Sequence, residues 1–370
     1  MTDSEYTIRP IEPDDGDEFI EIFNRTWSAA KTTEWFEWRY LDNPYVEEIP
    51  GYVAEHEGEI VATRPYKAIT VRSGDVERLA FHGVDSMTLP EHQRKGLFTR
   101  LNEAAIEDFT DRPEGERPAF VFTHSNENSK PGHRKMGVRY FGEMVRHTRV
   151  QRAGSYVRDQ IGGLPGRVGS GVANALNRAY LRSRDRRTPF ETEQFDVERH
   201  ESVPVATLAG IAESNRPDTA HVVFDEAFHD WYFAEPDNQP EATYVVRWDG
   251  HPMAGVVLGR DYDERNDTTM VRIRHAVPAA STPEHAAAFA AAFEVLLGDY
   301  GDVDLLRTQL DVVPESVLQA YGFVPDDRFP MSTLADRAGL TFGLRPIPEE
   351  SWKLDGRPIQ SAESTLWTIA

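Results

Sequence analysis

The residues with the clearest capacity for chemistry lie in Gly83–Leu101, GVDSMTLPEHQRKGLFTRL. A strand-like run is followed there by a proline and then by a basic, glycine-containing loop that opens a helix. The first backbone N–H groups of a helix have no partner inside it and lie at the positive end of the helix dipole. Together with Arg94 and Lys95, such groups form a cradle for a pyrophosphate, so the loop indicates phosphate binding.

The elements that would position this loop alternate between strands and helices through the first 150 residues, which predicts a mixed α/β domain. Helices are expected at Gly16–Trp27, Thr33–Leu41, Gly96–Phe109 and Asn128–Met136. Strands are expected at Tyr6–Ile11, Gly51–Glu55, Ile60–Thr63, Ala68–Arg72, Leu79–Leu89, Ala119–His124 and Phe141–Val150.

The second half of the chain repeats the first half faintly but in order. The matching pairs are Pro44 with Pro236 and Gly58 with Gly250, both 192 positions apart, Pro90–His92 with Pro283–His285, 193 apart, and Gly137 with Gly322, 185 apart. We therefore expect a duplicated fold, since four ordered matches at a nearly constant offset are unlike chance. An unrelated second domain is the alternative.

This repeat divides the chain into four parts: an N-terminal unit at 1–150, a basic connector with a helix at 151–190, a degenerate second copy at 191–340 and a C-terminal extension at 341–370. Between Lys130 and Arg187 there are 14 basic and 3 acidic residues, a charge of +11. The connector arginines are expected to pair with the acidic units on either side; an anion site is the alternative.

Composition narrows the possible functions. The 62 acidic and 40 basic residues give a net charge of -22, which disfavours general nucleic-acid binding. The chain has no cysteine, which excludes disulfide frameworks, thiolate metal sites and cysteine nucleophiles, and no histidine spacing indicates a metal site. No signal peptide or membrane-spanning run is evident, so we expect a cytoplasmic protein that does not cross a membrane.

An acidic, lysine-poor and cysteine-free chain resembles the proteins of salt-accumulating haloarchaea. Outside Lys130–Arg187 the charge is -22 minus 11, or -33, and these charges repel one another when salt does not screen them. We expect the melting temperature to rise from low to multimolar KCl, as thermal melts can measure. An ordinary acidic protein would give a flat or falling series.

The basic loop resembles motif A of the GNAT family of acyl-CoA N-acyltransferases, whose signature is Gln/Arg-x-x-Gly-x-Gly/Ala. Gln93, Arg94, Lys95, Gly96, Leu97 and Phe98 occupy the motif. Phe98 departs from it, since the family has Gly or Ala there. The resemblance covers the first 150 residues and implies two tandem GNAT-like domains, each a mixed, mostly antiparallel sheet flanked by helices.

The resemblance also implies a binding site for acetyl-CoA as co-substrate. Met87, Thr88 and Leu89 would pair with the pantetheine arm, and the backbone of Arg94, Lys95, Gly96, Leu97, Phe98 and Thr99 would hold the pyrophosphate. Asn126 occupies the family's Asn position in NENSKPGHRKMGV. Glu34, Trp35 and Trp38 lie on the helix with which the family contacts its acceptor, although an aromatic helical face more often belongs to the core.

Acid and base candidates follow from the same comparison. His133 replaces the family's Tyr, which protonates the departing CoA thiolate, and a histidine can donate a proton near neutrality. The alternative is a surface histidine in a basic run. His82 and Asp85 are the base candidates, and strand alternation places them on opposite faces. The alternative for Asp85 is a structural role, in which it is hydrogen-bonded to the backbone.

These features favour an acyltransferase that moves acetyl from acetyl-CoA to a primary amine of a small molecule or peptide. A non-catalytic CoA-binding or interaction protein is the alternative, because fold does not fix function. Aminoacyl transfer from transfer RNA has only the connector in its favour. The second copy is expected to be silent, because Ala286–Phe293, AAAFAAAF, and Leu318 replace the basic loop and the acid position.

Overall fold

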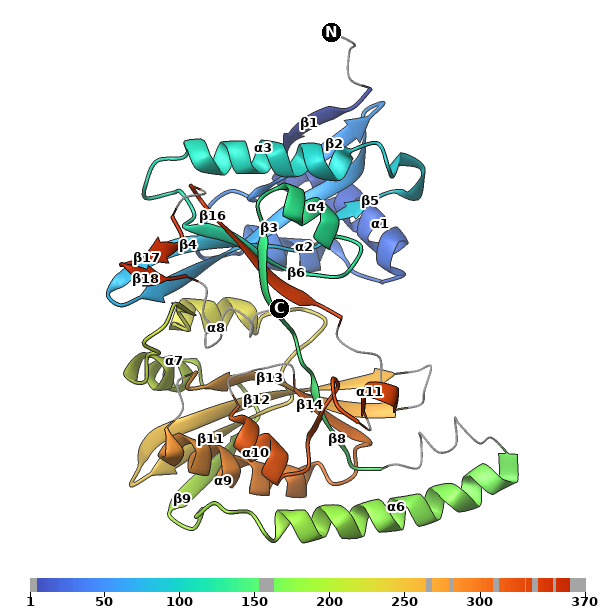
Figure 1. Ribbon diagram of the computed structural model, residues 1–370, viewed down its shortest axis with the longest axis vertical. Coiled ribbons are helices and arrows are strands. Elements are labelled where there is room, and N and C mark those ends of the chain that lie inside the picture. Colours follow the sequence, from blue (N-terminus) through green and yellow to red (C-terminus); the bar gives the residue numbers. More distant parts are fainter. Residues whose placement is uncertain are drawn as a thin grey trace.

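The protein consists of two α/β units, each built on its own sheet (Figure 1). The computed structural model describes residues 5–152, 163–263, 268–279, 282–308, 313–329, 331–334, 339–348 and 351–359. The expected connector residues 153–162 and the chain end at 360–370 lie outside these ranges. Among the described residues, no helix has the length and apolar character needed to cross a membrane.

The first sheet has the order β1-β2-β3-β4-β6-β16-β7, and β5 and β10 both pair with β3. Its strands are β1 (Thr7–Pro10), β2 (Gly51–His56), β3 (Glu59–Ser73), β4 (Val76–Gly83), β5 (Met87–Thr88), β6 (Phe120–Ser125), β7 (Arg139–Glu143), β10 (His221–Val222) and β16 (Thr341–Pro346). Its helices are α1 (Gly16–Trp27), α2 (Thr33–Phe36), α3 (Leu97–Asp111) and α4 (Lys130–Lys135), with short turns at η1 (Pro13–Asp15), η2 (Glu37–Leu41) and η3 (Pro90–His92).

The second sheet has the order β15-β8-β14-β13-β12-β11-β9. Its strands are β8 (His147–Val150), β9 (Phe195–His200), β11 (Ala242–Trp248), β12 (His251–Asp263), β13 (Thr268–Val277), β14 (Leu305–Thr308) and β15 (Val324–Pro325). Its helices are α6 (Gly163–Asp185), α7 (Val205–Ser214), α8 (Glu226–Tyr232), α9 (Pro283–Asp299), α10 (Glu315–Ala320) and α11 (Met331–Leu334), and β17 (Lys353–Leu354) pairs with β18 (Arg357–Pro358) in a separate ribbon.

Apart from the short β10, which the second half adds beside β3, the two sheets exchange one strand each. β8 comes from the first half of the chain and lies between β14 and β15, and β16 comes from the chain's end and lies between β6 and β7. Figure 1 shows green β8 among the orange strands and red β16 in the upper unit. This corrects the expected boundaries at 150 and 341: Phe141–Val150 is not one strand but two, in different sheets, and the expected extension begins with a strand of the first sheet.

Apart from this exchange, the two sheets have the same strand order, with β9 corresponding to β1 and β15 to β7. Trp38 and Trp231, which are 193 positions apart, meet between the units. The indole N–H of Trp38 donates to the carbonyl oxygen of Trp231 at 2.6 Å, and that of Trp231 donates to the carbonyl oxygen of Trp38 at 2.8 Å. Such reciprocal bonds are those expected across a two-fold axis relating two copies.

The predicted elements of the first half were largely correct in type and place. The two expected strands Ile60–Thr63 and Ala68–Arg72 are parts of one strand, β3, since Pro65 lies in it without ending it. The expected strand Leu79–Leu89 is divided into β4 and β5, because the chain leaves β6 after Gly83. This division forms the site described below.

The arginines near the connector bind mainly backbone carbonyls and a neighbouring aspartate. Arg149 forms two hydrogen bonds to Asp185, at 2.7 and 2.8 Å, and also donates to the carbonyl oxygen of Tyr321. Arg184 donates to the carbonyl oxygens of Gln319 and Ala320. These contacts attach α6 to the second unit. They are not the expected pairing of connector arginines with acidic side chains of both units, because most acceptors are backbone carbonyls and Asp185 lies on α6 itself.

Candidate active site

A cavity of about 470 Å³ lies where β4 separates from β6. Its walls come from the end of α1, from β5, from the loop before α3 and from the segment that leads into α4. The lining residues are Thr26, Trp27, Ser86, Met87, Thr88, His92, Gln93, Arg94, Gly96, Leu97, Phe98, Asn126, Asn128, Ser129 and Gly132.

The loop before α3 owes its shape to two left-handed residues. Arg94 has a φ of 62° and Gly96 a φ of 78°, and α3 begins directly afterwards at Leu97. A Cβ on Gly96 would meet no atom within 4 Å, so this position requires glycine for its backbone conformation and not for lack of space. The N–H groups of Leu97, Phe98 and Thr99 have no acceptor one turn earlier in the helix and can bind an anion.

The opposite wall is a strand edge. β4 pairs in parallel with β6 at Phe81 and His82, and it ends at Gly83. After three residues outside the strand, Met87 and Thr88 form β5, which pairs with β3 at Thr63 and Ala62. The other edge of β5 faces the cavity, so its main-chain groups can pair with an extended ligand.

The sequence comparison fits this geometry. The family model of the Acetyltransferase (GNAT) domain matches residues 7–125, which span β1 to β6. The first half carries a GNAT acetyltransferase domain. The comparison with curated proteins gave no match to the chain.

Several solved structures share the fold over 92% of this chain. One is a probable N-acyltransferase from Enterococcus faecalis V583, with a TM-score of 0.62, 10% identity and 72% of its own length covered. Two are GCN5-related N-acetyltransferases, from Anabaena variabilis ATCC 29413 with a TM-score of 0.57, 9% identity and 73% covered, and from Kribbella flavida with 0.54, 12% and 71%. At such identities the likeness establishes the fold alone.

Most residues expected to bind CoA line the cavity of the GNAT domain, namely Met87, Thr88, Arg94, Gly96, Leu97, Phe98 and Asn126. Leu89, Lys95 and Thr99 do not line it. Leu89 is buried in the core, and Lys95 is directed to the Tyr6 hydroxyl, 2.7 Å away. Asn126 also shapes the wall, since its side-chain oxygen accepts hydrogen bonds from the N–H groups of Asn128 and Ser129.

Phe98, the departure from the motif, packs its ring on α4. A Cβ at Gly132 would lie 2.7 Å from this ring, so a glycine at 132 makes room for the larger side chain at 98. The ring centroids of Phe98 and His133 are 5.1 Å apart. The backbone of Phe98 remains in the first turn of α3, where the family motif needs it.

His133 is not a surface residue, because only 3% of it is exposed. Its Nε2 accepts a hydrogen bond from Arg64 Nη2 at 3.3 Å, and its Nδ1 lies 2.8 Å from Ser125 Oγ. Because arginine can only donate, Nε2 carries no proton and Nδ1 is the protonated nitrogen. Burial, helped by Arg64, lowers the pKa of His133 to about 3. His133 is thus neutral near pH 7 with both nitrogens engaged, which disfavours a general-acid role.

The two base candidates lie around a buried lysine that the sequence analysis missed. Asp85 has a φ of 46° beyond the end of β4, so strand alternation does not extend to it. Its carboxylate accepts hydrogen bonds from Arg39 Nε at 2.5 Å and the Tyr40 hydroxyl at 2.6 Å. His82 lies directly opposite Lys67 in the register of β3 and β4.

Lys67 can take up a proton near neutrality. Burial and the nearby Arg39 lower its pKa to about 7, while Asp85 and Glu235 act in the opposite direction. Burial and Lys67 hold the pKa of His82 well below its usual range, and His82 Nε2 lies 3.1 Å from His124 Nδ1. The sequence signal that could have identified this group is a lysine within the strand segment KAITV, which is otherwise largely apolar.

The expected acceptor-binding residues do not gather at the cavity. Glu34 is exposed, and Trp35 is buried in the core, where its ring packs on Phe23. Trp38 is buried against Trp231 of the second half, with the two ring centroids 6.1 Å apart. Trp35 and Trp38 therefore fit the core role that the sequence analysis named as the alternative to acceptor binding.

Among the described residues of the second half, none forms an equivalent of the loop before α3. α9 begins at Pro283, directly after a Thr282 cap that accepts a hydrogen bond from the N–H of His285, and most residues of Ala286–Phe293 are buried. Leu318 occupies the place of His133. The N–H of Phe323 donates to the carbonyl oxygen of Leu318, just as the N–H of Val138 donates to the carbonyl oxygen of His133. The start of α9 thus differs from the loop before α3, and a silent second copy stays a prediction.

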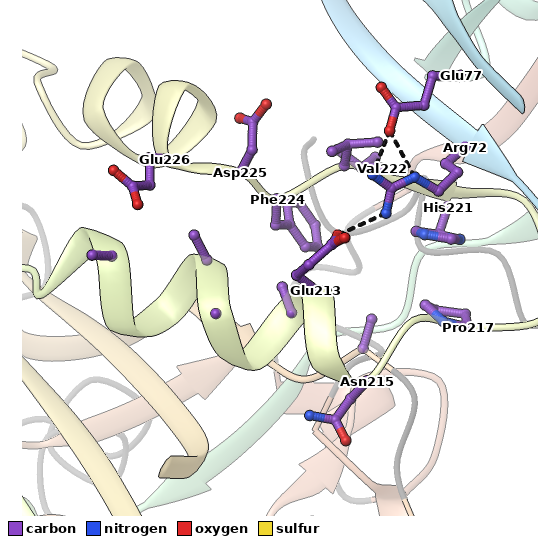
Figure 2. A pocket seen from close by; sticks show the side chains of 16 residues that line it. Arg72, Glu77, Glu213, Asn215, Pro217, His221, Val222, Phe224, Asp225 and Glu226 are labelled. Carbon is purple, nitrogen blue, oxygen red and sulfur yellow. Dashed lines mark hydrogen bonds and ion pairs between the residues drawn. The ribbon is translucent and has the colours of Figure 1, made fainter. Parts of the chain in front are cut away.

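A second cavity, of about 410 Å³, lies between the two halves (Figure 2). Arg72 of β3 lies there between Glu77 of β4 and Glu213 of α7. Arg72 Nε donates to Glu77, and its Nη1 donates to Glu213 at 2.8 Å. Since none of the expected site residues lines this cavity, it is separate from the cavity beside the loop. Arg72 connects the first sheet to a helix of the second half.

Proposed function

We propose that the chain is an acyl-CoA-dependent N-acyltransferase that transfers acetyl from acetyl-CoA to a primary amine of a small molecule or peptide. The observation that carries this proposal is the cavity between the left-handed loop before α3 and the edge of β5. One wall offers N–H groups and Arg94 to a pyrophosphate, and the other offers strand pairing to an amide-containing arm. Members of the GNAT family use acetyl-CoA in this way.

In this proposal acetyl-CoA supplies the activated acyl group, and the chain supplies binding and proton management. The amine attacks the thioester directly, so orientation of the two substrates provides much of the rate. Lys67 is the proposed base, because it is buried near Asp85 and has a pKa of about 7. His133, the acid candidate from the sequence, is assigned a positioning role through Arg64 and Ser125.

We expect Gly96→Val to weaken CoA binding at least tenfold. A β-branched residue at a φ of 78° is strained, and relief of this strain would move the N–H groups of the loop. Calorimetry in high salt measures the affinity and, for the wild type, should give one CoA per chain. Gly115→Val is the matched control, because a Cβ there also meets no atom within 4 Å but Gly115 has no left-handed φ.

Three results would count against these expectations. Wild-type protein that binds no CoA would end the proposed function. Unchanged affinity in Gly96→Val would remove the loop from the site. A stoichiometry of two CoA per chain would show that the second half has a working site.

Turnover distinguishes an enzyme from a non-catalytic CoA-binding protein. Acetyl-CoA is supplied with a panel of primary amines, and release of free CoA is followed with a thiol reagent, which has no background because the protein contains no cysteine. Amine-dependent release is expected. Tight CoA binding without release for any amine would favour the non-catalytic alternative.

A further inference from the structure

Arg64 is a buried cation beside the inner end of the CoA cavity. Only 4% of the residue is exposed. Its guanidinium donates to Asn102 Oδ1 at 2.8 Å, Tyr66 Oη at 3.2 Å, Ser86 Oγ at 2.5 Å and His133 Nε2 at 3.3 Å. Each of these acceptors is a neutral group, so the described residues give Arg64 four hydrogen bonds and no ion pair.

Within the part of the chain that the structure describes, the charged and titratable groups that pack around Arg64 do not neutralise it. They are His133 of α4, Tyr66 of β3, His82 of β4, Tyr140 of β7 and Arg345 of β16. None is a carboxylate, and Arg64 contributes to holding the pKa values of His82 and His133 below their usual range. Burying a charge without a counter-ion is unfavourable, and an anion bound nearby would offset that cost.

Ser86 connects this charge to the cavity. Its hydroxyl oxygen accepts from Arg64, and Ser86 lines the cavity one residue before β5. The Ser86 oxygen accepts the hydrogen bond of Arg64, so the hydroxyl proton is directed away from Arg64. This proton can therefore be donated to a group in the cavity. A hydroxyl whose oxygen accepts from a cation is a stronger donor than an isolated one.

We propose that Ser86, polarised by Arg64, donates a hydrogen bond to the CoA thiolate as it leaves. This inference rests on the proposed function. It follows from the direction of the ligand: with the pyrophosphate at Arg94–Thr99 and the pantetheine arm along Thr88 and Met87, the thioester end comes next to Ser86. Ser86 is then a catalytic residue and Arg64 a positioning residue that also supplies the charge.

The step balances without a protein acid. The amine nitrogen bonds to the thioester carbon, the C–S bond breaks, and the electron pair of that bond stays on sulfur. The extra proton of the amine passes to Lys67 or to water. The thiolate, stabilised by Ser86 and Arg64, leaves as the anion and is protonated in solvent. This removes the need for the proton donor that a neutral His133 does not provide.

The test measures the bound thiol and not turnover. CoA and desulfo-CoA, which lacks the sulfur, are titrated by calorimetry from pH 6 to 9 in high salt. If the site favours the thiolate, CoA affinity relative to desulfo-CoA rises with pH, and the bound thiol has a pKa at least about one unit below that of the free thiol, a tenfold preference. Arg64→Gln and Ser86→Ala should remove most of this rise.

Control variants separate the charge from general effects on binding. Arg94→Gln should weaken CoA and desulfo-CoA by the same factor and leave the pH dependence of their ratio intact. Ser86→Ala removes one half-buried hydroxyl, so it keeps the inference testable if Arg64→Gln fails to fold. Ser86→Ala is also expected to lower kcat about tenfold with little change in KM for acetyl-CoA.

Equal pH dependence of CoA and desulfo-CoA in the wild type would overturn the inference, as would an unchanged ratio in Ser86→Ala. If acetyl transfer still occurs in that case, the proposed function stands and only this assignment fails. If neither ligand binds to the wild type, both are overturned.

Discussion

A chain that ends after residue 338 is expected to lose the folded first sheet, although it keeps every residue of the GNAT match at 7–125. β16 lies between β6 and β7, and its Phe342 and Leu344 are fully buried. Removing it exposes two strand edges and deletes two core side chains, each worth about 1.5–3 kcal/mol, from a fold whose total stability is of the order of 5–15 kcal/mol.

A point variant tests the same strand without shortening the chain. A Cβ on Gly343 would lie 2.7 Å from both Tyr140 and Val138, so Gly343→Ala forces β16 and β7 apart and should cost about 1–3 kcal/mol. Gly298→Ala is the matched control, because its Cβ would meet nothing within 4 Å. Urea unfolding in high salt provides the measurement.

The exchange also predicts how the protein unfolds. β8 contributes Thr148 and Arg149 to the core of the second unit, while β16 completes the first, so neither unit is whole when the other is lost. We expect Gly343→Ala to shift one common transition, seen alike by tryptophan fluorescence and circular dichroism. Two separated transitions, with only the first shifted, would contradict this coupling.

Local sequence pattern predicted the elements but not this exchange. Hydrophobic periodicity and turn residues identified α1 with its observed bounds, and α3 and β2 to within two residues. The same signals cannot say which strand lies beside which, because β8 (HTRV) and β16 (TFGLRP) are short mixed segments whose pattern would fit either sheet. The register that distinguishes them is set by partners about 160 to 220 positions away.

The residues of the candidate site likewise divide into those that local sequence predicted and those that it missed. The cradle was predictable because Gly96 and the start of α3 are adjacent in sequence and act through the backbone. Arg64, Lys67 and Ser86 were missed because their roles depend on burial and on neighbours from other strands and helices. His133 was found by position, but its pKa depends on burial beside Arg64, which no local pattern encodes.

Mild acid is expected to unfold the protein well above the pH at which carboxylates titrate. Five buried histidines, His82, His124, His133, His229 and His275, have pKa values lowered mainly by burial, to about 3 for His124 and His133 and about 4 for His229. Four of them form two contacting pairs, His82 with His124 and His229 with His275.

The direction in which stability changes with pH follows from proton uptake by the two states. Below pH 6.5 the unfolded chain binds protons at these histidines, and the folded chain does not until the pH approaches their lowered pKa values. The stability is therefore complete above pH 6.5 and is lost as the pH falls toward 4, at about 1.4 kcal/mol per pH unit for each histidine. Over two pH units the five together are comparable to the whole stability of an ordinary domain.

Urea unfolding at pH 7.5, 6.5 and 5.5 in multimolar KCl measures this dependence with charge repulsion screened. His82→Phe, which preserves a ring stacked on Phe122 at 4.4 Å, should reduce the slope of stability against pH by about 1.4 kcal/mol per unit. The exposed His251→Gln should leave the slope unchanged. A wild-type stability independent of pH between 7.5 and 5.5 would show that these histidines take up protons equally in the folded and unfolded chains. It would also contradict the assignment of a neutral His133 beside Arg64.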